Sequence, residues 1–192
     1  QPHRGANAIV AAARLIEFIP RKAKQRRAAA PAGNPFEPPY TTFQVGTIEG
    51  GTALNIIAQE CRFFWEFRTL PGDDPEEILA RFTAFAEQEV LPWMRESAPE
   101  AEIATTSRAT VPALAPEADG AAESLVRQVT GANRTGVVSF ATEGGLFQQA
   151  GMSAVVCGPG SIDQAHQPDE FITLEQVDKG TAFLRGLIDW AR

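Results

Sequence analysis

Apolar residues recur at helical spacing near the start of the chain. Residues 5–19 place their branched and small apolar side chains three or four positions apart, which is the period of an amphipathic helix. Pro20 is expected to end this helix, because proline lacks the amide hydrogen that the next turn requires. Residues 21–39 are basic and then proline-rich without periodicity, so we expect an exposed loop.

A second helical period follows Asp74, which can cap a helix. Pro75 suits the first helical position, and Glu77 has the spacing of a capping box. Pro92 is expected to close this helix. Its buried stripe is predicted to consist of Ile78, Leu79, Phe82, Ala86 and Val90.

Between these helices the pattern changes to the two-residue period of β-strands. Residues 41–47 are rich in strand-forming residues and precede a turn at 49–51. Residues 60–68 alternate more clearly, and a weaker alternation over residues 101–109 predicts a further strand. In the clear strand one face is expected to carry Cys61, Phe63, Trp65 and Phe67, and the other Arg62, Glu66 and Arg68.

The resulting order, helix–strand–strand–helix–strand, is that of a βαββαβ unit without its first strand. Residues 1–110 are therefore expected to form a ferredoxin-like α+β domain with a gap in the middle of its sheet, where the first strand would lie. An open three-stranded sheet that needs no other strand is the alternative.

The remaining residues, 111–192, predict an α/β arrangement. Helices are expected over 117–130, 143–150 and 173–192, and strands over 136–140 and 153–157. The last helix should present Leu174, Val177, Phe183, Leu184, Leu187 and Ile188 on one side. These strands are too few for a complete α/β domain, so both halves of the chain point to an upstream partner segment.

Composition and charge exclude some classes of function. The net charge of −7 argues against a nucleic-acid binder, and no apolar stretch is long enough to span a bilayer. Cys61 and Cys157 each lie in an apolar run, which favours buried, reduced thiols and a cytoplasmic protein.

Chemistry-bearing residues concentrate in residues 157–170, after the predicted strand 153–157. In open α/β sheets, loops at the carboxyl ends of strands bind ligands. His166 lies in this loop among acidic residues, and imidazole is a ligand for Zn²⁺ or Co²⁺. By itself a histidine in a loop is more often a surface residue than a ligand.

Residues 158–170 (GPGSIDQAHQPDE) resemble the C-terminal metal-ligand loop of the acetylornithine deacetylases in the M20 metallopeptidase family. Three other segments resemble the same family in order and spacing: residues 2–9 (PHRGANAI), 46–57 (GTIEGGTALNII) and 66–72 (EFRTLPG). Thr142 and Glu143 also match a short family motif. The resemblance spans essentially the whole chain, with 1–110 as a lid and dimerisation domain and 111–192 as the end of a zinc-peptidase-like catalytic domain.

The resemblance implies roles for individual residues. His166 corresponds to the last ligand of a two-metal Zn²⁺ or Co²⁺ centre, where the metals activate a bridging water. Asn55 and Arg68 correspond to lid residues that reach the substrate carboxylate, and Gly158 to a backbone contact with substrate. Without the resemblance, the position of Arg68 favours an exposed ion pair with Glu66 or Glu60 over a substrate contact. Glu143 either lies near the site or is simply a carboxylate at a helix N-terminus. The basic cluster could contact an acidic partner but fits a solvated loop better; it comprises Arg21, Lys22, Lys24, Arg26 and Arg27.

The family's upstream His-X-Asp, bridging aspartate and Glu-Glu motifs do not occur in these residues, and His3 matches a variable histidine rather than the oxyanion donor. We therefore expect no catalytic residue in this chain and no activity from it alone. The complete, cytoplasmic enzyme is expected to hydrolyse an N-acyl amino acid, N2-acetylornithine above all, as a homodimer formed through the lid. The alternatives are another M20 amidohydrolase, such as a succinyl-diaminopimelate desuccinylase or a carboxypeptidase, and a non-catalytic dimerisation module.

Overall fold

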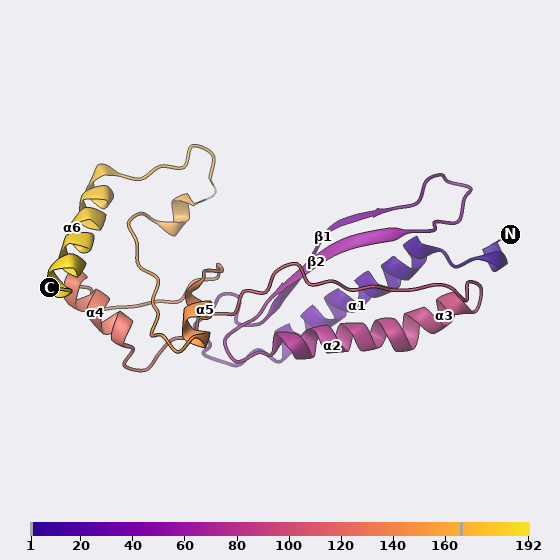
Figure 1. Cartoon of the computed structure of the whole chain (residues 1–192), viewed down its shortest axis with the longest axis horizontal. Coiled ribbons are helices and arrows are strands. Elements are labelled where there is room, and N and C mark those ends of the chain that lie inside the picture. Colours follow the sequence, from indigo (N-terminus) through magenta and orange to yellow (C-terminus); the bar gives the residue numbers. More distant parts are fainter. Residues whose placement is uncertain (1, 166) are drawn as a thin grey trace. The chain divides into compact units, whose positions relative to one another are not determined.

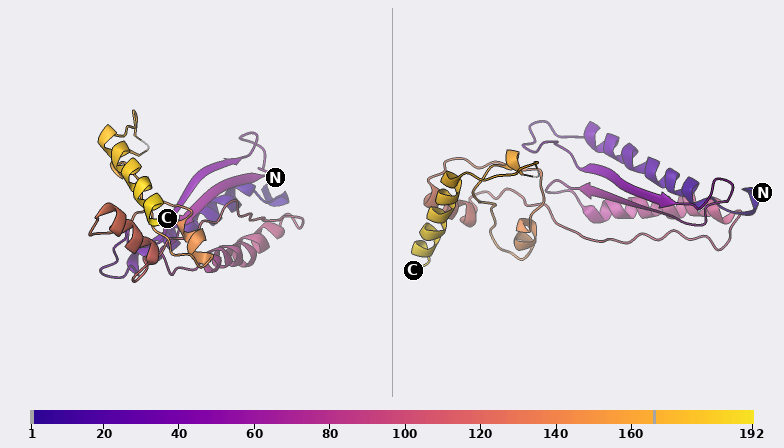
Figure 2. Two further views of the ribbon diagram at one scale, coloured as in Figure 1. Left: turned by 60° about the vertical axis from the view of Figure 1, so that its left-hand side comes forward. Right: turned by 90° about the horizontal axis from the view of Figure 1, so that it is seen from above.

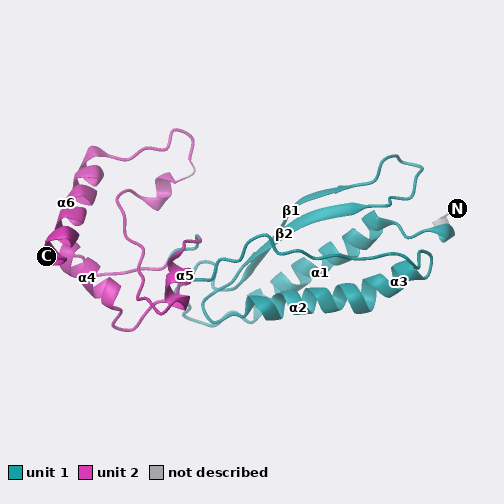
Figure 3. Cartoon of the chain, in the orientation of Figure 1, with its two compact units in different colours: residues 1–113, 138–140 teal, residues 114–137, 141–192 magenta. Residues whose placement is uncertain are grey.

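The computed structural model describes residues 2–165 and 167–192. Figure 1 shows the elements in chain order, and Figure 3 divides them into two compact units. The first unit comprises residues 1–113 and 138–140, and the second residues 114–137 and 141–192. The predicted mixture of helices and strands is confirmed, although the described residues contain a single two-stranded sheet.

A long helix, α1 (Ala8–Ala28), begins the first unit after a short 3₁₀ turn at Pro2–Arg4. Asn7 caps it by accepting hydrogen bonds from the amides of Ile9 and Val10. The prediction that Pro20 ends this helix is wrong, since the helix continues for two more turns. Proline removes one backbone hydrogen bond, but the following residues, RKAKQRR, are good helix formers that offset the loss.

The sheet pairs β1 (Thr42–Gly50) with β2 (Cys61–Arg68) in an antiparallel hairpin. Thr42 lies opposite Arg68 at one end, and Gly50 lies opposite Cys61 at the other. The predicted alternation of β2 is confirmed, with the aromatic side half-buried and the charged side exposed. In the connecting loop, Gly51 has φ 75°, and a Cβ there would lie 3.0 Å from Ile9. Glycine meets both the positive φ and the close approach to Ile9 without strain, because it has no Cβ.

The second helical stretch consists of α2 (Pro75–Phe85), a π turn (Ala86–Val90) and α3 (Leu91–Arg95). Asp74 caps α2 as predicted, accepting from the amide of Glu76 at 2.9 Å. The Glu77 carboxylate bonds Arg81 at 2.6 Å rather than the cap backbone, so the capping-box expectation is wrong. Pro92 does not close the helix either. The π turn before it accommodates a residue without a donor, so the chain continues to Arg95.

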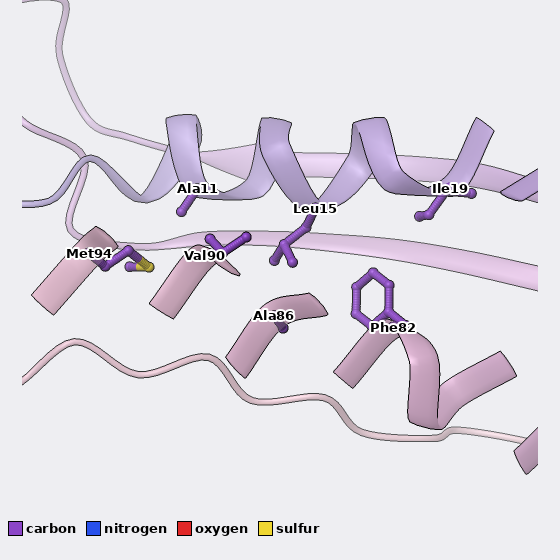
Figure 4. Packing of buried hydrophobic residues seen from close by; sticks show 7 residues of the cluster. All are labelled: Ala11, Leu15, Ile19, Phe82, Ala86, Val90 and Met94. Carbon is purple, nitrogen blue, oxygen red and sulfur yellow. The ribbon is translucent and has the colours of Figure 1, made fainter. Parts of the chain in front are cut away.

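The core of the first unit lies between the two helical stretches, and the sheet packs against it. Figure 4 shows side chains of α1 facing side chains of α2, the π turn and α3. Of the predicted stripe, Leu79 is half-buried and the other four are buried. Aromatic residues of the sheet close the cluster, with Trp65 and Phe82 ring centroids 4.6 Å apart. The buried cluster comprises Ala11, Leu15, Ile19, Phe82, Ala86, Val90 and Met94.

The strand predicted over 101–109 is not formed. These residues follow α3 without regular secondary structure, although Ala101 and Ile103 pack against the core. An extended segment becomes a strand by hydrogen bonding to a neighbour, and no backbone hydrogen bond joins residues 102–109 to another residue that the structure describes.

The second unit contains α4 (Ala121–Thr130), α5 (Gly144–Gln149), a 3₁₀ turn (Ile162–Gln164) and α6 (Leu174–Trp190). The helix predicted from 117 thus begins at Ala121. The strands predicted over 136–140 and 153–157 are not formed in the described chain. Without a sheet to cover, α6 leaves Leu174, Val177, Leu184 and Ile188 exposed. Cys157 is exposed as well, against the expectation of a buried thiol, whereas Cys61 is half-buried and burial raises its pKa.

Candidate functional site

Arg68 ends β2 on the polar face of the sheet. Its Nε and Nη2 atoms donate to Oε1 of Glu66 at 3.3 and 3.2 Å. The two side chains are 59% and 56% exposed. Solvent screens such a pair, so it contributes on the order of 0–1 kcal/mol to stability and can exchange partners cheaply. The surface ion pair that the sequence left open as an alternative is therefore present.

A hollow of about 370 Å³ opens beside Arg68, in the first unit. Ser139, from the short segment that returns to this unit, donates a hydrogen bond to the carbonyl of Glu37 at its margin. A guanidinium in the wall of such a hollow can bind a carboxylate through two parallel hydrogen bonds. The lining residues are Pro38, Thr42, Phe43, Gln44, Glu66, Phe67, Arg68 and Ser139.

The loop that follows Arg68 is anchored by a polar cluster that sequence reasoning missed. Asp73 accepts from Arg26 at 3.2 Å and from the hydroxyl of Thr41. Thr41 is 1% exposed, and its oxygen also accepts from the amide of Leu70 at 3.4 Å. The cluster escaped notice because Arg26 was expected in a solvated loop rather than on a helix facing α2.

Other members of the basic cluster also have partners. The guanidinium of Arg21 lies 5.6 Å from the ring centroid of Phe85, and the ammonium of Lys22 lies 5.1 Å from that of Phe18. The Arg21 contact joins α1 to α2, whereas the Lys22 contact lies within α1. The loop interpretation of the cluster is thus wrong.

Asn55 lies in the loop between the two strands, residues 51–60, and is exposed. Its neighbours Leu54 and Ile56 are exposed as well, Leu54 completely. Within the described chain no hydrogen bond engages the Asn55 side chain. The amide is therefore available to an external group.

Asn55 and Arg68 stand at opposite ends of the hairpin, as Figure 1 shows for the loop and the far end of β2. From Cys61 to Arg68 the strand rises about 23 Å, at about 3.3 Å per residue. One amino-acid-sized ligand cannot touch both side chains of the same chain. The motifs themselves do not indicate this separation, because they lie close together along the chain.

Gly158 lies in the second unit, in an exposed loop with open space where a Cβ would stand. The loop is tied to α6, since the amide of Gly160 donates to Gln176 at 3.3 Å. On its upstream side, Glu117 accepts from Ser153 at 2.5 Å and from the amide of Ala154 at 3.1 Å. These bonds, with a third from Gln148, hold the pKa of Glu117 below its ordinary value.

His166, the predicted metal ligand, lies outside the described residues. Among the residues that are described, no group of three His, Cys, Asp or Glu side chains could hold a metal ion. A catalytic zinc needs about three protein ligands. The described residues therefore do not by themselves form a two-metal centre.

Glu143 precedes α5 at its N-terminal end. Its carboxylate makes no capping bond, whereas its carbonyl accepts from the amide of Leu146 at 2.9 Å. The neighbouring Thr142 hydroxyl accepts from the amide of Gly144 at 3.2 Å. The Thr142–Glu143 pair thus starts a short helix, and its geometry assigns the carboxylate no further partner in the described chain.

Residues 1–94 match the M20 family of peptidase dimerisation domains. This chain carries an M20 dimerisation domain. The domain runs from the start of the chain to Met94 in α3, so it includes both Asn55 and Arg68. The family resemblance inferred from sequence motifs is confirmed.

Curated relatives extend the match beyond the dimerisation domain. An acetylornithine deacetylase from Myxococcus xanthus is 35% identical over 184 residues, which cover 95% of this chain and 46% of the relative. One from Yersinia pseudotuberculosis is 32% identical over 190 residues, covering 98% and 46%. An N-acetyl-L-citrulline deacetylase from Xanthomonas campestris is 36% identical over 141 residues, covering 71% and 36%. The chain spans less than half the length of each relative.

No helix among the described residues is both long enough and apolar enough to cross a lipid bilayer.

Proposed function

We propose that the complete protein to which this chain belongs hydrolyses N-acyl amino acids, with N2-acetylornithine, cleaved to ornithine and acetate, as the principal substrate. The observation that carries the proposal is the 35% identity to an acetylornithine deacetylase over 95% of the chain. In this proposal residues 1–110 act as a lid and dimerisation domain of ferredoxin-like type. Residues 111–192 complete a metal-dependent catalytic domain.

Arg68 is proposed to bind the substrate carboxylate. The hollow beside it supplies room, and the exposed ion pair with Glu66 supplies a guanidinium whose present partner is easily exchanged. A substrate carboxylate that takes the place of Glu66 would keep the two-pronged geometry that arginine prefers.

Asn55 is proposed to contact a substrate held by the partner subunit. Its distance from Arg68 along β2 prevents the two side chains of one chain from sharing one small ligand. A homodimer formed through the dimerisation domain would let each active site combine Arg68 of one subunit with Asn55 of the other. The exposure of the loop tip around Leu54 fits an element that reaches out of its own domain.

Gly158 and His166 are proposed to belong to the catalytic side of the site. The backbone of Gly158 is open to approach, and the Gly160–Gln176 bond and the Glu117 cluster fix the loop on both sides. His166 would supply one ligand to Zn²⁺ or Co²⁺, and the bound metals would activate water for attack on the amide. The remaining ligands and the general base would come from other parts of the protein.

A second acylated amino acid is favoured by one comparison. The Xanthomonas campestris relative is named an N-acetyl-L-citrulline deacetylase, and citrulline differs from ornithine in replacing the side-chain amine by a neutral urea group. A dimerisation module without catalysis is the candidate of a different class, favoured by the match of residues 1–94.

The test is expression of the encoding open reading frame in full, supplied with Zn²⁺ or Co²⁺, and assay with three acylated substrates. Release of acetate from N2-acetylornithine faster than from N-acetylcitrulline, and faster than desuccinylation of N-succinyl-diaminopimelate, supports the proposal. The 192-residue chain alone should show no activity above background. A full-length protein that dimerises but hydrolyses none of the three substrates would leave the dimerisation module as the function.

A further inference from the structure

A second hollow in the first unit lies where the last turns of α1 meet the first turns of α2, and its volume is about 240 Å³. Figures 1 and 2 show these two helix ends at the same end of the unit. This helix-end hollow shares Phe43 with the hollow beside Arg68, and its other lining residues are different. Every lining residue falls within residues 18–81, so the two helices and the hairpin enclose it.

The inner wall of the helix-end hollow is apolar. Phe43 on β1, Trp65 on β2 and Phe18 on α1 all line it and are half-buried, so their rings keep some exposed surface. Ile19 and Ile78 are buried and complete this wall. A ligand that covers exposed apolar surface removes it from water, so the wall favours a ligand with an apolar body.

Two of the three cations that line the hollow already have carboxylate partners. The Arg26 guanidinium lies 3.2 Å from the carboxylate of Asp73, and that of Arg81 lies 2.6 Å from the carboxylate of Glu77. Glu77 lines the hollow as well, and a second nitrogen of Arg26 lies 3.9 Å from it. Two carboxylates thus balance the two guanidiniums.

Lys22 is the third cation, and it has no carboxylate within 4.0 Å among the residues that the structure describes. Its ammonium donates to the side-chain oxygen of Gln25 at 3.2 Å and lies 5.1 Å from the ring centroid of Phe18. Both of these partners are uncharged. The charged groups around the hollow therefore carry one positive charge in excess, which a single carboxylate would balance.

We propose that the helix-end hollow binds a small monocarboxylate with an aromatic or branched aliphatic body. The carboxylate would pair with Lys22, and the apolar body would lie against Trp65 and Phe43. A volume of about 240 Å³ is below the range of about 300–1,000 Å³ that is usual for drug-sized ligands, so the ligand is small. It is also too small for a helix, whose diameter is about 10 Å. The site belongs to the first unit and does not depend on deacylase activity.

The experiment titrates the protein expressed from the full reading frame with 3-phenylpropionate and, separately, with the uncharged 3-phenylpropionamide. The readout is the NMR resonance of the isoleucine methyl groups of Ile19 and Ile78, which report this wall and no other part of the protein. Both methyl groups should shift saturably. The acid should bind at least about fivefold more tightly than the amide, because the amide cannot form the charge-assisted bond to Lys22.

Lys22→Gln should weaken binding of the acid to the level of the amide and leave binding of the amide unchanged. Unchanged amide binding shows that the hollow is intact in this variant. Lys24→Gln is the matched control, because Lys24 lies on the same helix, is exposed and does not line the hollow. It should leave the affinities for both compounds unchanged.

Three results would overturn the proposal. The first is the absence of a saturable shift at Ile19 and Ile78 with either compound. The second is equal affinity for the acid and the amide, or a preference for the acid that survives Lys22→Gln. The third is a shift of these methyl groups that grows with protein concentration in the absence of ligand, which would show that a second copy of the chain occupies the hollow.

Discussion

Arg26 and Asp73 lie 47 positions apart in the sequence and form an ion pair, with Nη1 3.2 Å from Oδ1. Asp73 also accepts from the buried hydroxyl of Thr41. The end of α1, the residue before β1 and the turn before α2 therefore meet at one carboxylate. Because that turn follows Arg68, the cluster also fixes the end of the strand that carries the proposed substrate contact.

Thr41→Val should lower the free energy of unfolding by about 1–2 kcal/mol, because the substitution keeps the shape but leaves Asp73 and the Leu70 amide without a buried partner. Urea unfolding followed by circular dichroism measures the change. Thr47→Val, at an exposed position of β1, is the matched control and should stay within about 0.5 kcal/mol. Equal effects of the two substitutions would show that the hydrogen bonds of the Thr41 hydroxyl do not contribute to the free energy of unfolding.

Pro20→Ala should raise the free energy of unfolding by about 1–3 kcal/mol, since α1 passes through this exposed position and alanine restores the missing hydrogen bond. Pro92→Ala should gain less, because the π turn before Pro92 already accommodates it. The measurement is the urea unfolding midpoint of each variant, compared with the midpoint of the parent. A loss of stability in Pro20→Ala would mean that restriction of the unfolded chain by proline outweighs the helix term.

Arg68→Ala should change stability little, within about 0.5 kcal/mol, because the side chain is exposed and its ion pair is screened. In the protein expressed from the full reading frame it should raise KM strongly, and Arg68→Lys should restore KM in part, since an ammonium lacks the planar fork. Arg62→Ala, on the same face at the other end of β2, is the control and should leave KM unchanged.

A substrate amide without the carboxylate sharpens the Arg68 test. It should be equally poor for the parent and for Arg68→Ala, because neither can form the pair. If the variant discriminates between acid and amide as well as the parent does, Arg68 is an ordinary surface charge.

Glu117 should make the second unit sensitive to acid. Hydrogen bonds from Ser153, Gln148 and the Ala154 amide lower the pKa of this carboxyl in the folded state. The stabilisation is thus fully present above the pKa of the unfolded chain, about 4.3, and is lost as pH falls through the lower folded value. NMR titration of the Ala154 amide should give a midpoint below that of a carboxyl in the unfolded chain, and Glu117→Gln should abolish that transition. A midpoint at or above the unfolded value contradicts the hydrogen-bonded carboxylate.

His166→Ala, in the protein expressed from the full reading frame, should reduce bound Zn²⁺ or Co²⁺ and lower turnover by orders of magnitude, because a site that loses a ligand loses affinity and geometry. His3→Ala should leave both quantities unchanged. Metal analysis of the purified variants and initial rates with N2-acetylornithine provide the readouts. Unchanged metal content in His166→Ala would show that His166 is a surface residue and not a metal ligand.

Local features were predictable where a short pattern carries a single physical meaning. The alternation of β2 followed from its aromatic and charged residues, and the Asp74 cap followed from its place before Pro75. Both prolines in helices were misjudged, because the prediction weighed the lost hydrogen bond at Pro20 and Pro92 without the compensation around them.

Features that depend on distant residues were not predictable. The alternation of residues 101–109 indicates a capacity for strand formation, but a strand forms only beside a partner. The buried role of Thr41 depends on Asp73 and Arg26, which no spacing connects to it. The separation of Asn55 from Arg68 appears only once the hairpin register is known. Motifs thus identified the site residues without placing them.

Gly46 has a consequence for how β1 tolerates insertions and deletions. The register of the hairpin shifts between Val45 and Thr47, so Val45 lies opposite Trp65 and Ile48 lies opposite Phe63, both on the side of the helices. If Gly46 were paired in the ladder instead of bulging out of it, the odd-numbered phase would continue, and the carboxylate of Glu49 rather than the side chain of Ile48 would turn toward the apolar layer. The bulge at Gly46 thus lets a strand written in two opposite phases keep one apolar side, and deletion of this glycine would leave that side unchanged, because Val45, Thr47 and Ile48 would continue a regular ladder with the same partners.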